Sequence, residues 1–228
     1  MLIIGHRGAM GHAPENTLEA IQVALAMGVD SIEIDVYAVD SEIVVIHDGT
    51  LMRTTNGFGK VMNQTSDYLR SLDAGNGQKI PFLSEVISLI DAKVGLNIEL
   101  KGPNTAGPII NYLDNHLPSH WAKDQILLSS FEHEQLENAK ALNPSYNRAP
   151  LYWKNKIDYS YAVETLEAVA VNPWLPTVTQ KMVDGAHDHG LQVFVYTVNK
   201  PADIERMRSY GVDGIFTNYP DRGRSELS

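Results

Sequence analysis

The sequence predicts an α/β protein that forms one domain over residues 1–228, a (β/α)8 TIM barrel with a small insertion after its second strand. Three observations lead to this fold class. The chain has 228 residues, which is usual for one α/β barrel and long for two independent domains. Eight short runs rich in β-branched residues alternate with amphipathic stretches, and such alternation indicates a parallel sheet. One segment, residues 38–80, interrupts the alternation and predicts the insertion.

The expected barrel strands begin with the first residues of the chain and are distributed along its whole length. Each is a short apolar run that glycine or polar residues bound, as is typical of strands buried in a parallel sheet. We expect them at Leu2–Gly5, Ser31–Tyr37, Leu96–Lys101, Ile126–Phe131, Arg148–Trp153, Ala168–Asn172, Gln192–Val198 and Gly214–Thr217.

Most of the stretches between these runs carry apolar residues three and four positions apart, which is the spacing of one helical face. In the first of them, Leu18, Ile21 and Leu25 recur in this way. Gly28 and Gly190 each follow a candidate helix, where a glycine favours the C-cap. The expected helices are Thr17–Met27, Phe82–Asp91, Ala106–His116, His133–Leu142, Val178–His189 and Ala202–Tyr210.

The segment after the second strand does not fit the repeat. Ile43–His47 has the composition of a strand, yet only about six residues separate it from Tyr37, whereas a parallel crossover needs about ten or more. We therefore expect an antiparallel return strand, with a turn at Asp40-Ser41. Residues 48–80 then show little periodicity and several Gly, Asn and Thr. The whole segment 38–80 is predicted to be an insertion between the second strand and its helix.

Composition excludes several classes of function. The net charge is −10 and no cluster of Lys and Arg is present, which argues against a nucleic-acid partner. The absence of cysteine excludes disulfides and Cys-ligated metals. No apolar run approaches the roughly 18 residues of a membrane span. The first residues lack the basic start of a secretory signal, so we expect a cytoplasmic protein.

Acidic residues gather at the expected strand ends, where a barrel of this type places its active site. Glu33 and Asp35 are two residues apart on one strand and therefore face the same side, and Glu99 ends the next barrel strand. Together they would repel one another unless one were protonated or a cation joined them. Oxygen ligands without cysteine fit Mg²⁺ or Ca²⁺. The alternative, structural ion pairs of Glu33 with Arg7 and of Glu99 with Lys101 across the barrel, explains one carboxylate better than all three.

Two histidines flank this expected carboxylate cluster. His6 ends the first strand and His47 ends the return strand. A single histidine at a strand end is more often a packing residue than a catalyst, but two of them beside the cluster favour catalysis. Cleavage of a phosphodiester needs one group to remove a proton and another to supply one. Histidine serves both roles, because its pKa of about 6.5 lies near neutral pH.

These residues fall within blocks that resemble the glycerophosphodiester phosphodiesterase family. No single block is specific, but the ordered set covers nearly the whole chain and is highly specific. The blocks are His6-Arg7-Gly8, Ala13-Pro14-Glu15-Asn16-Thr17, Glu33-Ile34-Asp35-Val36, Val44-Val45-Ile46-His47-Asp48, Glu99-Leu100-Lys101, Ser129-Ser130-Phe131, Tyr196-Thr197-Val198-Asn199 and Gly214-Ile215-Phe216-Thr217-Asn218-Tyr219-Pro220.

The resemblance implies a fold and a set of roles. It implies the barrel with its insertion, a divalent metal ion bound by Glu33, Asp35 and Glu99, and acid/base catalysis by His6 and His47. By the family pattern, His6 is the first base and His47 the first acid. The residues alone leave that order open.

Four further residues take substrate-binding roles by the same resemblance. Arg7 and Lys101 would contact the phosphate. Glu15 belongs to a motif that usually faces the site, through hydrogen bonds or behind the metal. Tyr196 stands where many relatives have tryptophan. It keeps an aromatic wall but adds a hydroxyl, which bears on the choice of leaving alcohol.

The implied reaction is hydrolysis of a small-molecule glycerophosphodiester to sn-glycerol 3-phosphate and an alcohol such as choline or ethanolamine, a step of glycerol and lipid metabolism. By resemblance, the glycerol 2-hydroxyl attacks the phosphorus, and water then opens the cyclic phosphate.

One alternative is a lysophospholipase D-type phosphodiesterase on the same barrel, with an apolar groove to which Trp153, Trp174 and Leu175 contribute. Another is a non-catalytic barrel that binds phosphate esters, although such chains usually lose a histidine or a metal carboxylate. A metal-independent aldolase or isomerase using Lys101 would leave the carboxylates unexplained.

Overall fold

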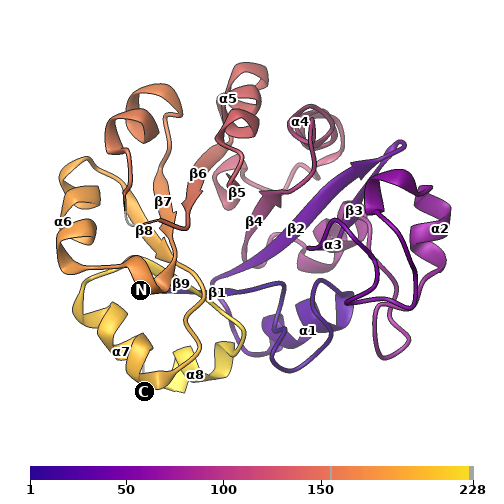
Figure 1. Cartoon of the computed structure of the whole chain (residues 1–228), viewed down its shortest axis with the longest axis horizontal. Helices are drawn as coiled ribbons and strands as arrows, with labels where there is room; N and C mark the ends of the chain where they lie inside the picture. Colours follow the sequence, from indigo (N-terminus) through magenta and orange to yellow (C-terminus); the bar gives the residue numbers. More distant parts are fainter. Residues whose placement is uncertain (155, 226–228) are drawn as a thin grey trace.

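Parallel strands close into a barrel at the centre of the molecule, and helices cover its outside (Figure 1). The computed structural model describes residues 1–154 and 156–225. Within those residues, eight parallel strands pair in the order β1-β2-β4-β5-β6-β7-β8-β9, and β9 pairs with β1 to complete the ring. The predicted fold class, a (β/α)8 TIM barrel, is therefore confirmed.

The observed elements follow the expected order with small shifts at their ends. The strands are β1 (Leu2–Gly5), β2 (Ser31–Val39), β3 (Glu42–Val45), β4 (Gly95–Leu100), β5 (Ile126–Ser130), β6 (Asn147–Tyr152), β7 (Ala170–Pro173), β8 (Gln192–Val195) and β9 (Gly214–Thr217). The α-helices are α1 (Leu18–Ala26), α2 (Ser66–Ser71), α3 (Leu83–Ile90), α4 (Ala106–His116), α5 (His133–Leu142), α6 (Gln180–Asp188), α7 (Pro201–Ser209) and α8 (Pro220–Ser225).

The structure differs from the sequence-based expectation at three points. The strand expected at Gln192–Val198 ends at Val195. Beyond it, the backbone N–H of Val198 still donates to the oxygen of Phe216, outside a regular ladder. Between β6 and β7 the chain forms a π-helical segment, Tyr161–Thr165, where the sequence predicts no helix. The short helices α2 and α8 also lack a sequence signal, since six residues are too few to show a helical period.

The alternation of side chains along each strand divides the protein interior into two layers. Ile32, Ile34 and Ile98 belong to the large core between the barrel and its helices. A smaller cluster fills the barrel itself and consists of Ile4, Ala149, Ala170, Phe194 and Phe216. Because side chains alternate with a period of two, residues two positions beyond this inner cluster point into the barrel mouth. The alternation therefore determines which residues can form a site there.

The predicted insertion contains the expected return strand. β3 pairs antiparallel with the second half of β2, from Val36 opposite Val45 to Val39 opposite Glu42, and Asp40 adopts φ 53° in the turn between them. Figure 1 shows β3 and α2 beside the outer end of β2. The insertion buries an apolar cluster that it shares with β2, formed by Tyr37, Val39, Val44, Ile46, Leu51, Val61, Leu69, Leu72, Ala74 and Ile80.

The helices are short and present one apolar face to the barrel. The longest, α4, has 11 residues and buries Ala106, Ile109, Ile110 and Leu113. In the part of the chain that the structure describes, no helix combines the length and the apolar character needed to cross a bilayer.

We propose that residues 1–228 form one cooperative domain, because β2 contributes to both the barrel and the insertion core. Leu69 of α2 is fully buried in the insertion core. Leu69→Ala should lower the free energy of unfolding by about 2–5 kcal/mol, the usual cost of a buried Leu→Ala change. Urea unfolding followed by circular dichroism and by tryptophan fluorescence should give one coincident transition. The control Leu142→Ala, at a leucine 57% exposed on α5, should change stability by less than about 0.5 kcal/mol. Two separated transitions in the wild type would contradict a single domain.

Candidate active site

A cavity of about 260 Å³ opens at the carboxyl ends of the barrel strands. Acidic, basic and imidazole side chains line one part of it, and apolar and aromatic side chains line the other. The lining residues are His6, Arg7, Glu33, His47, Asn97, Glu99, Ser129, Phe131, Leu151, Trp174, Tyr196, Thr197 and Phe216. The cavity therefore has the form of a small-molecule site, in which apolar and aromatic walls adjoin a set of convergent polar and charged groups.

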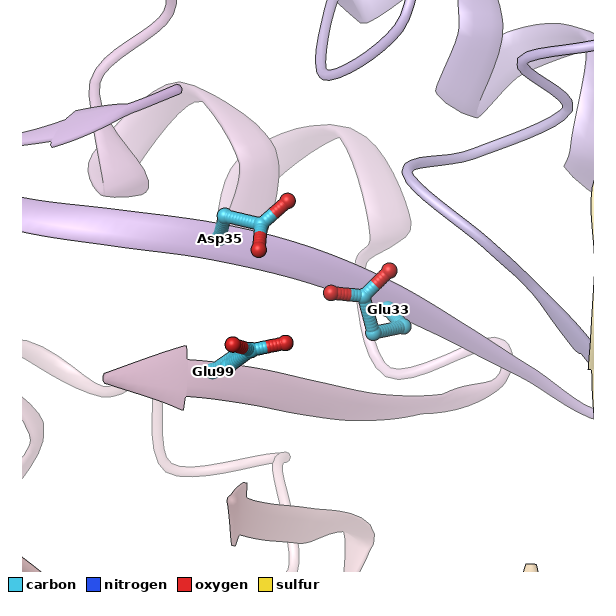
Figure 2. A group of neighbouring side chains, drawn as sticks. All are labelled: Glu33, Asp35 and Glu99. Atoms are coloured by element: carbon cyan, nitrogen blue, oxygen red, sulfur yellow. The ribbon is translucent and has the colours of Figure 1, made fainter. Parts of the chain in front are cut away.

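The three predicted metal-binding carboxylates meet beside this cavity. Glu33 and Asp35 lie on β2 and Glu99 on β4, where Asp35 and Glu99 are direct neighbours in the parallel register. One carboxylate oxygen from each lies within 4.8 Å of the others, and all three side chains are buried. Figure 2 shows the three carboxylates pointing toward one another from the adjacent strands.

The electrostatics of this cluster differ from one carboxylate to the next. Burial, together with the charges of Asp35 and Glu99, raises the pKa of Glu33 well above its usual range. Burial and Asp35 raise the pKa of Glu99 to about 7. Burial opposes ionisation of Asp35 as well, but Arg7, His47 and Lys101 hold its pKa below the ordinary value. Without a cation, Asp35 is thus the most readily ionised member of the cluster.

The cluster fits a divalent cation on chemical grounds. Among the described residues, Glu33 Oε1 and Asp35 Oδ1 are buried without a hydrogen-bond donor, although buried acceptors are normally paired. Three carboxylates with no sulfur or imidazole ligand form a donor set for a hard ion such as Mg²⁺ or Ca²⁺. Glu33, Asp35 and Glu99 could therefore hold such an ion.

His6 enters the cavity from the end of β1. Its Nδ1 lies 2.7 Å from Asn218 Oδ1, and its Nε2 lies 4.0 Å from Glu33 Oε2. An amide oxygen only accepts hydrogen bonds, so Nδ1 carries the proton and Nε2 presents a lone pair. Burial, followed by the charge of Arg7, lowers the pKa of His6 to about 4. His6 is therefore a neutral imidazole near pH 7.

His47 lines the same cavity from the loop that follows β3. Its Nδ1 lies 2.6 Å from Asp48 Oδ1, so a carboxylate accepts its Nδ1 proton and favours the imidazolium form. Burial nevertheless lowers the pKa of His47. The two histidines thus differ in the partner that orients them, an amide for His6 and a carboxylate for His47.

The loop after β1 places Arg7 against two carboxylates. Gly8 adopts φ 77°, and a Cβ on it would lie 2.5 Å from a backbone carbon of Ala20, so only glycine allows this turn against α1. The Arg7 guanidinium lies 3.2 Å from Asp35 and donates to Glu15 at 2.7 Å. Its backbone N–H, and not its guanidinium, bonds Glu33 at 2.8 Å. The sequence suggests a possible ion pair between the side chains of Arg7 and Glu33. The structure instead has a hydrogen bond from the main chain of Arg7 to Glu33.

Lys101 follows β4 and contacts two carboxylates of the cluster. Its Nζ donates to Glu99 Oε1 at 2.8 Å and lies 3.7 Å from Asp35 Oδ1. The structural ion pair between Glu99 and Lys101 is therefore present in the same cluster. Lys101 is not among the residues that line the main cavity, since it contributes to a neighbouring hollow with Pro103 and Glu132.

Glu15 and Tyr196 lie at different depths in the site. The Glu15 carboxylate is behind Arg7 and lines an adjoining hollow but not the main cavity. The ring of Tyr196 lines the main cavity and contacts Phe131 edge to face, with ring centroids 5.7 Å apart. Its hydroxyl donates to the backbone oxygen of Tyr152 at 2.9 Å. The hydroxyl that distinguishes this residue from tryptophan is therefore engaged by the main chain.

Several residues of the site carry no assigned role in the sequence-based reading. Asn16 donates to Asp35 Oδ2 at 2.9 Å, and Asn218 orients His6. Both lie in recognised blocks, so a search for side-chain partners of the carboxylates and histidines could have identified them. Asp48 adjoins His47 in the sequence. Arg53 contacts Asp48 and Glu15, but it lies in the irregular insertion, where no periodicity marks it.

Comparisons with known proteins agree with this geometry. A family model described as "Glycerophosphoryl diester phosphodiesterase family" matches residues 6–222. The glycerophosphodiester phosphodiesterase of Caldanaerobacter subterraneus subsp. tengcongensis is 36% identical over 230 residues, which cover 96% of this chain and 95% of that protein. One from Bacillus subtilis is 33% identical over 247 residues, covering 97% and 84%.

Solved structures of phosphodiesterases are also similar to this chain. A phosphodiesterase of Oleispira antarctica, in complex with the product sn-glycerol-3-phosphate, is 30% identical, with a TM-score of 0.92 over 100% of this chain and 96% of that one. A putative glycerophosphoryl diester phosphodiesterase from Silicibacter pomeroyi is 28% identical, with a TM-score of 0.90 over 100% and 92%.

The raised pKa of Glu99, about 7 in the folded protein, makes the metal-free stability depend on pH. Between about pH 5 and pH 7 the folded chain binds more protons at this group than the unfolded chain, so stability falls as the pH rises. In a chelator, the free energy of unfolding of the wild type should fall by on the order of 3 kcal/mol across this window, relative to that of Glu99→Gln. Urea titrations at several pH values measure the difference, in which contributions common to both proteins cancel. Mg²⁺ or Ca²⁺ should remove the slope, because a cation favours the ionised carboxylate. A pH-independent difference in chelator would contradict the raised pKa.

Proposed function

The chain belongs to the glycerophosphoryl diester phosphodiesterase family, and from this premise we propose how its cavity cleaves a substrate. Family membership makes the protein a phosphoric diester hydrolase with glycerophosphodiester phosphodiesterase activity. We propose a metal-dependent hydrolysis to sn-glycerol 3-phosphate and an alcohol, with two histidines as acid and base. One observation carries the proposal: two differently oriented histidines line one cavity beside three buried, converging carboxylates.

Glu33, Asp35 and Glu99 would hold the divalent ion, Mg²⁺ or Ca²⁺. When bound, such an ion lowers the pKa of a hydroxyl and neutralises phosphate charge. The similar phosphodiesterase of Oleispira antarctica is in complex with the product sn-glycerol-3-phosphate. That product contains both a phosphate and neighbouring hydroxyls, which are the groups that this donor set would engage.

Arg7 and Lys101 would bind the phosphate oxygens that bear the developing negative charge. Both cations lie against Asp35, so they are held at the cluster before substrate arrives. Their side chains are mostly buried, with 13% and 16% exposed. Glu15 orients Arg7 from behind. A cation fixed in a partly dry cavity stabilises charge more strongly than one in water.

His6 would act first as the base. Its Nε2 lone pair would take the proton of the glycerol 2-hydroxyl, whose oxygen then attacks phosphorus. His47 would protonate the departing alcohol oxygen as the P–O bond breaks, leaving a cyclic phosphate. In the second step water attacks the cyclic phosphate and the roles reverse, so both histidines return to their initial states. The amide partner of His6 and the carboxylate partner of His47 support this order.

The aromatic part of the cavity would contact the leaving alcohol or the glycerol carbons. Tyr196 supplies its ring as a wall, since its hydroxyl is bonded to Tyr152. The lysophospholipase D-type alternative keeps one specific support: Trp153 is 69% exposed, and Trp174, which lines the cavity, is 45% exposed. An exposed aromatic residue that lines the cavity, as Trp174 does, could hold an acyl chain, so the substrate panel must include a lysophospholipid.

One assay tests the proposed function directly. Purified protein, chelated exhaustively and then supplied with Mg²⁺ or Ca²⁺, is given glycerophosphocholine, glycerophosphoethanolamine, glycerophosphoglycerol and lysophosphatidylcholine. We expect sn-glycerol 3-phosphate from the glycerophosphodiesters, loss of activity in chelator and recovery with a cation. Full activity after chelation would contradict the metal assignment. Preferred turnover of lysophosphatidylcholine would instead support the alternative.

The two-histidine mechanism predicts losses that depend on the leaving group. His6→Ala and His47→Ala should each lower kcat by about 10²- to 10⁴-fold, the usual value of general acid or base catalysis. The two losses should not add, because the pair acts as a unit. A nitrophenyl ester needs little acid assistance, so it should restore His47→Ala and leave His6→Ala impaired. The opposite rescue would exchange the roles, and near-normal activity of both variants on the natural substrate would contradict the mechanism.

A further inference from the structure

One guanidinium in the insertion binds two carboxylates of the site, each through a pair of hydrogen bonds. Arg53 donates from Nε and Nη2 to the two oxygens of Asp48, at 2.6 and 2.9 Å. It donates from Nη1 and Nη2 to the two oxygens of Glu15, both at 2.8 Å. Such a planar fork fixes the rotation of a carboxylate as well as its position.

Each of these carboxylates contacts a residue of the proposed mechanism. Glu15 Oε1 also accepts from Arg7, which lies against Asp35. Asp48 Oδ1 also accepts the Nδ1 proton of His47. Two chains of hydrogen bonds therefore begin at Arg53. One leads through Glu15 to Arg7, which would bind the phosphate, and the other leads through Asp48 to His47, the proposed acid.

Arg53 lowers the pKa of both carboxylates in these chains. Its hydrogen bonds hold the pKa of Asp48 well below the ordinary value. Burial would raise the pKa of Glu15, but the hydrogen bonds from Arg53, followed by the charge of Arg7, keep it below that value. The Glu15 side chain is only 10% exposed and that of Asp48 is 24% exposed. Without Arg53, each carboxylate would lose two donors, and the largely buried Glu15 would lose them in a place where water replaces them poorly.

We propose that Arg53 is a positioning residue that aligns both halves of the catalytic apparatus, Arg7 through Glu15 and His47 through Asp48. The inference rests on the proposed function, since it concerns how the same site works. It gives the insertion a catalytic purpose: the segment that interrupts the barrel repeat supplies one cation that positions two side chains from separate loops of the same cavity.

The two chains predict separate kinetic signatures, measured with glycerophosphocholine and with a nitrophenyl ester of glycerol phosphate. Asp48→Asn should lower kcat for glycerophosphocholine and spare the nitrophenyl ester, because only the alkoxide leaving group needs the acid. Glu15→Gln should raise KM for both substrates, because Arg7 loses its support. Arg53→Ala should combine the two effects, each on the order of 10- to 100-fold, as expected for displaced catalytic groups.

Conservative and double variants separate positioning from charge. Arg53→Lys should recover little, because one ammonium cannot pair with both carboxylates in forked geometry. In the Asp48→Asn background, Arg53→Ala should cause no further loss in kcat, since residues in one network do not contribute additively. Full rescue by lysine would reduce the role of Arg53 to charge alone and overturn the proposal.

Arg70 provides a matched control in the same insertion. It pairs with Glu85 and donates to the backbone of Ile80, so Arg70→Ala also removes an insertion arginine from its acidic partner. We expect Arg70→Ala to keep kcat, KM and the leaving-group dependence of the wild type. If Arg53→Ala matches Arg70→Ala in kinetics, or lowers both substrates equally with KM unchanged, the positioning role is wrong.

Failure of the inference can be told from failure of the proposed function. An inactive wild type, or near-normal activity of both His6→Ala and His47→Ala on the natural substrate, would contradict the proposed function and its mechanism. A wild type and a His47→Ala variant that behave as proposed, beside Arg53 variants that do not, would contradict the inference alone. If Arg53→Ala does not fold, as melting curves would show, Asp48→Asn and Glu15→Gln each still test one chain. Absence of their separate signatures would overturn the proposal.

Discussion

The mutual repulsion of three buried carboxylates is the constraint on which the rest of this site depends. Glu33, Asp35 and Glu99 lie within 4.8 Å of one another with little water to screen them, so the surroundings must supply positive charge or protons. Arg7 and Lys101 supply part of that charge at Asp35. What they leave uncompensated gives the cluster its capacity for a divalent ion. An ion held there would give a net acidic protein a place to bind an anionic substrate.

The barrel produces this crowding through its register and not through any unusual local conformation. Parallel pairing of β2 with β4 sets Asp35 beside Glu99, and the period of two sets Glu33 on the same side of β2 as Asp35. The intervening Ile34 and Ile98 pack outward in the main core. Each strand therefore serves stability with one set of side chains and chemistry with the other. A slip of one residue would exchange the two sets and bury the carboxylates against the helices.

Much of this could be predicted because the signals are local. The spacing of apolar residues predicted the barrel, and the short distance between Tyr37 and Ile43 predicted the antiparallel return that β3 makes. The sequence offered no comparable signal for Arg53, whose partners lie 5 and 38 positions away. Asn218 lies in a recognised block, but nothing in the sequence pairs it with His6, 212 positions away. Such contacts depend on where loops meet after the barrel has closed. A single sequence contains no period that encodes them.

The length of β2 has a consequence for the motions of the molecule. Its first residues pair with β1, most of the strand pairs with β4, and its second half pairs with β3. The strand that carries two of the three carboxylates is thus held by neighbours along its whole length and shared by two apolar cores. Loops can fray without disturbing it, whereas freeing its amides would require both of these apolar cores to open. In hydrogen exchange, β2 would belong to the last segment to acquire deuterium, so breathing of the cavity rim leaves the carboxylate cluster intact.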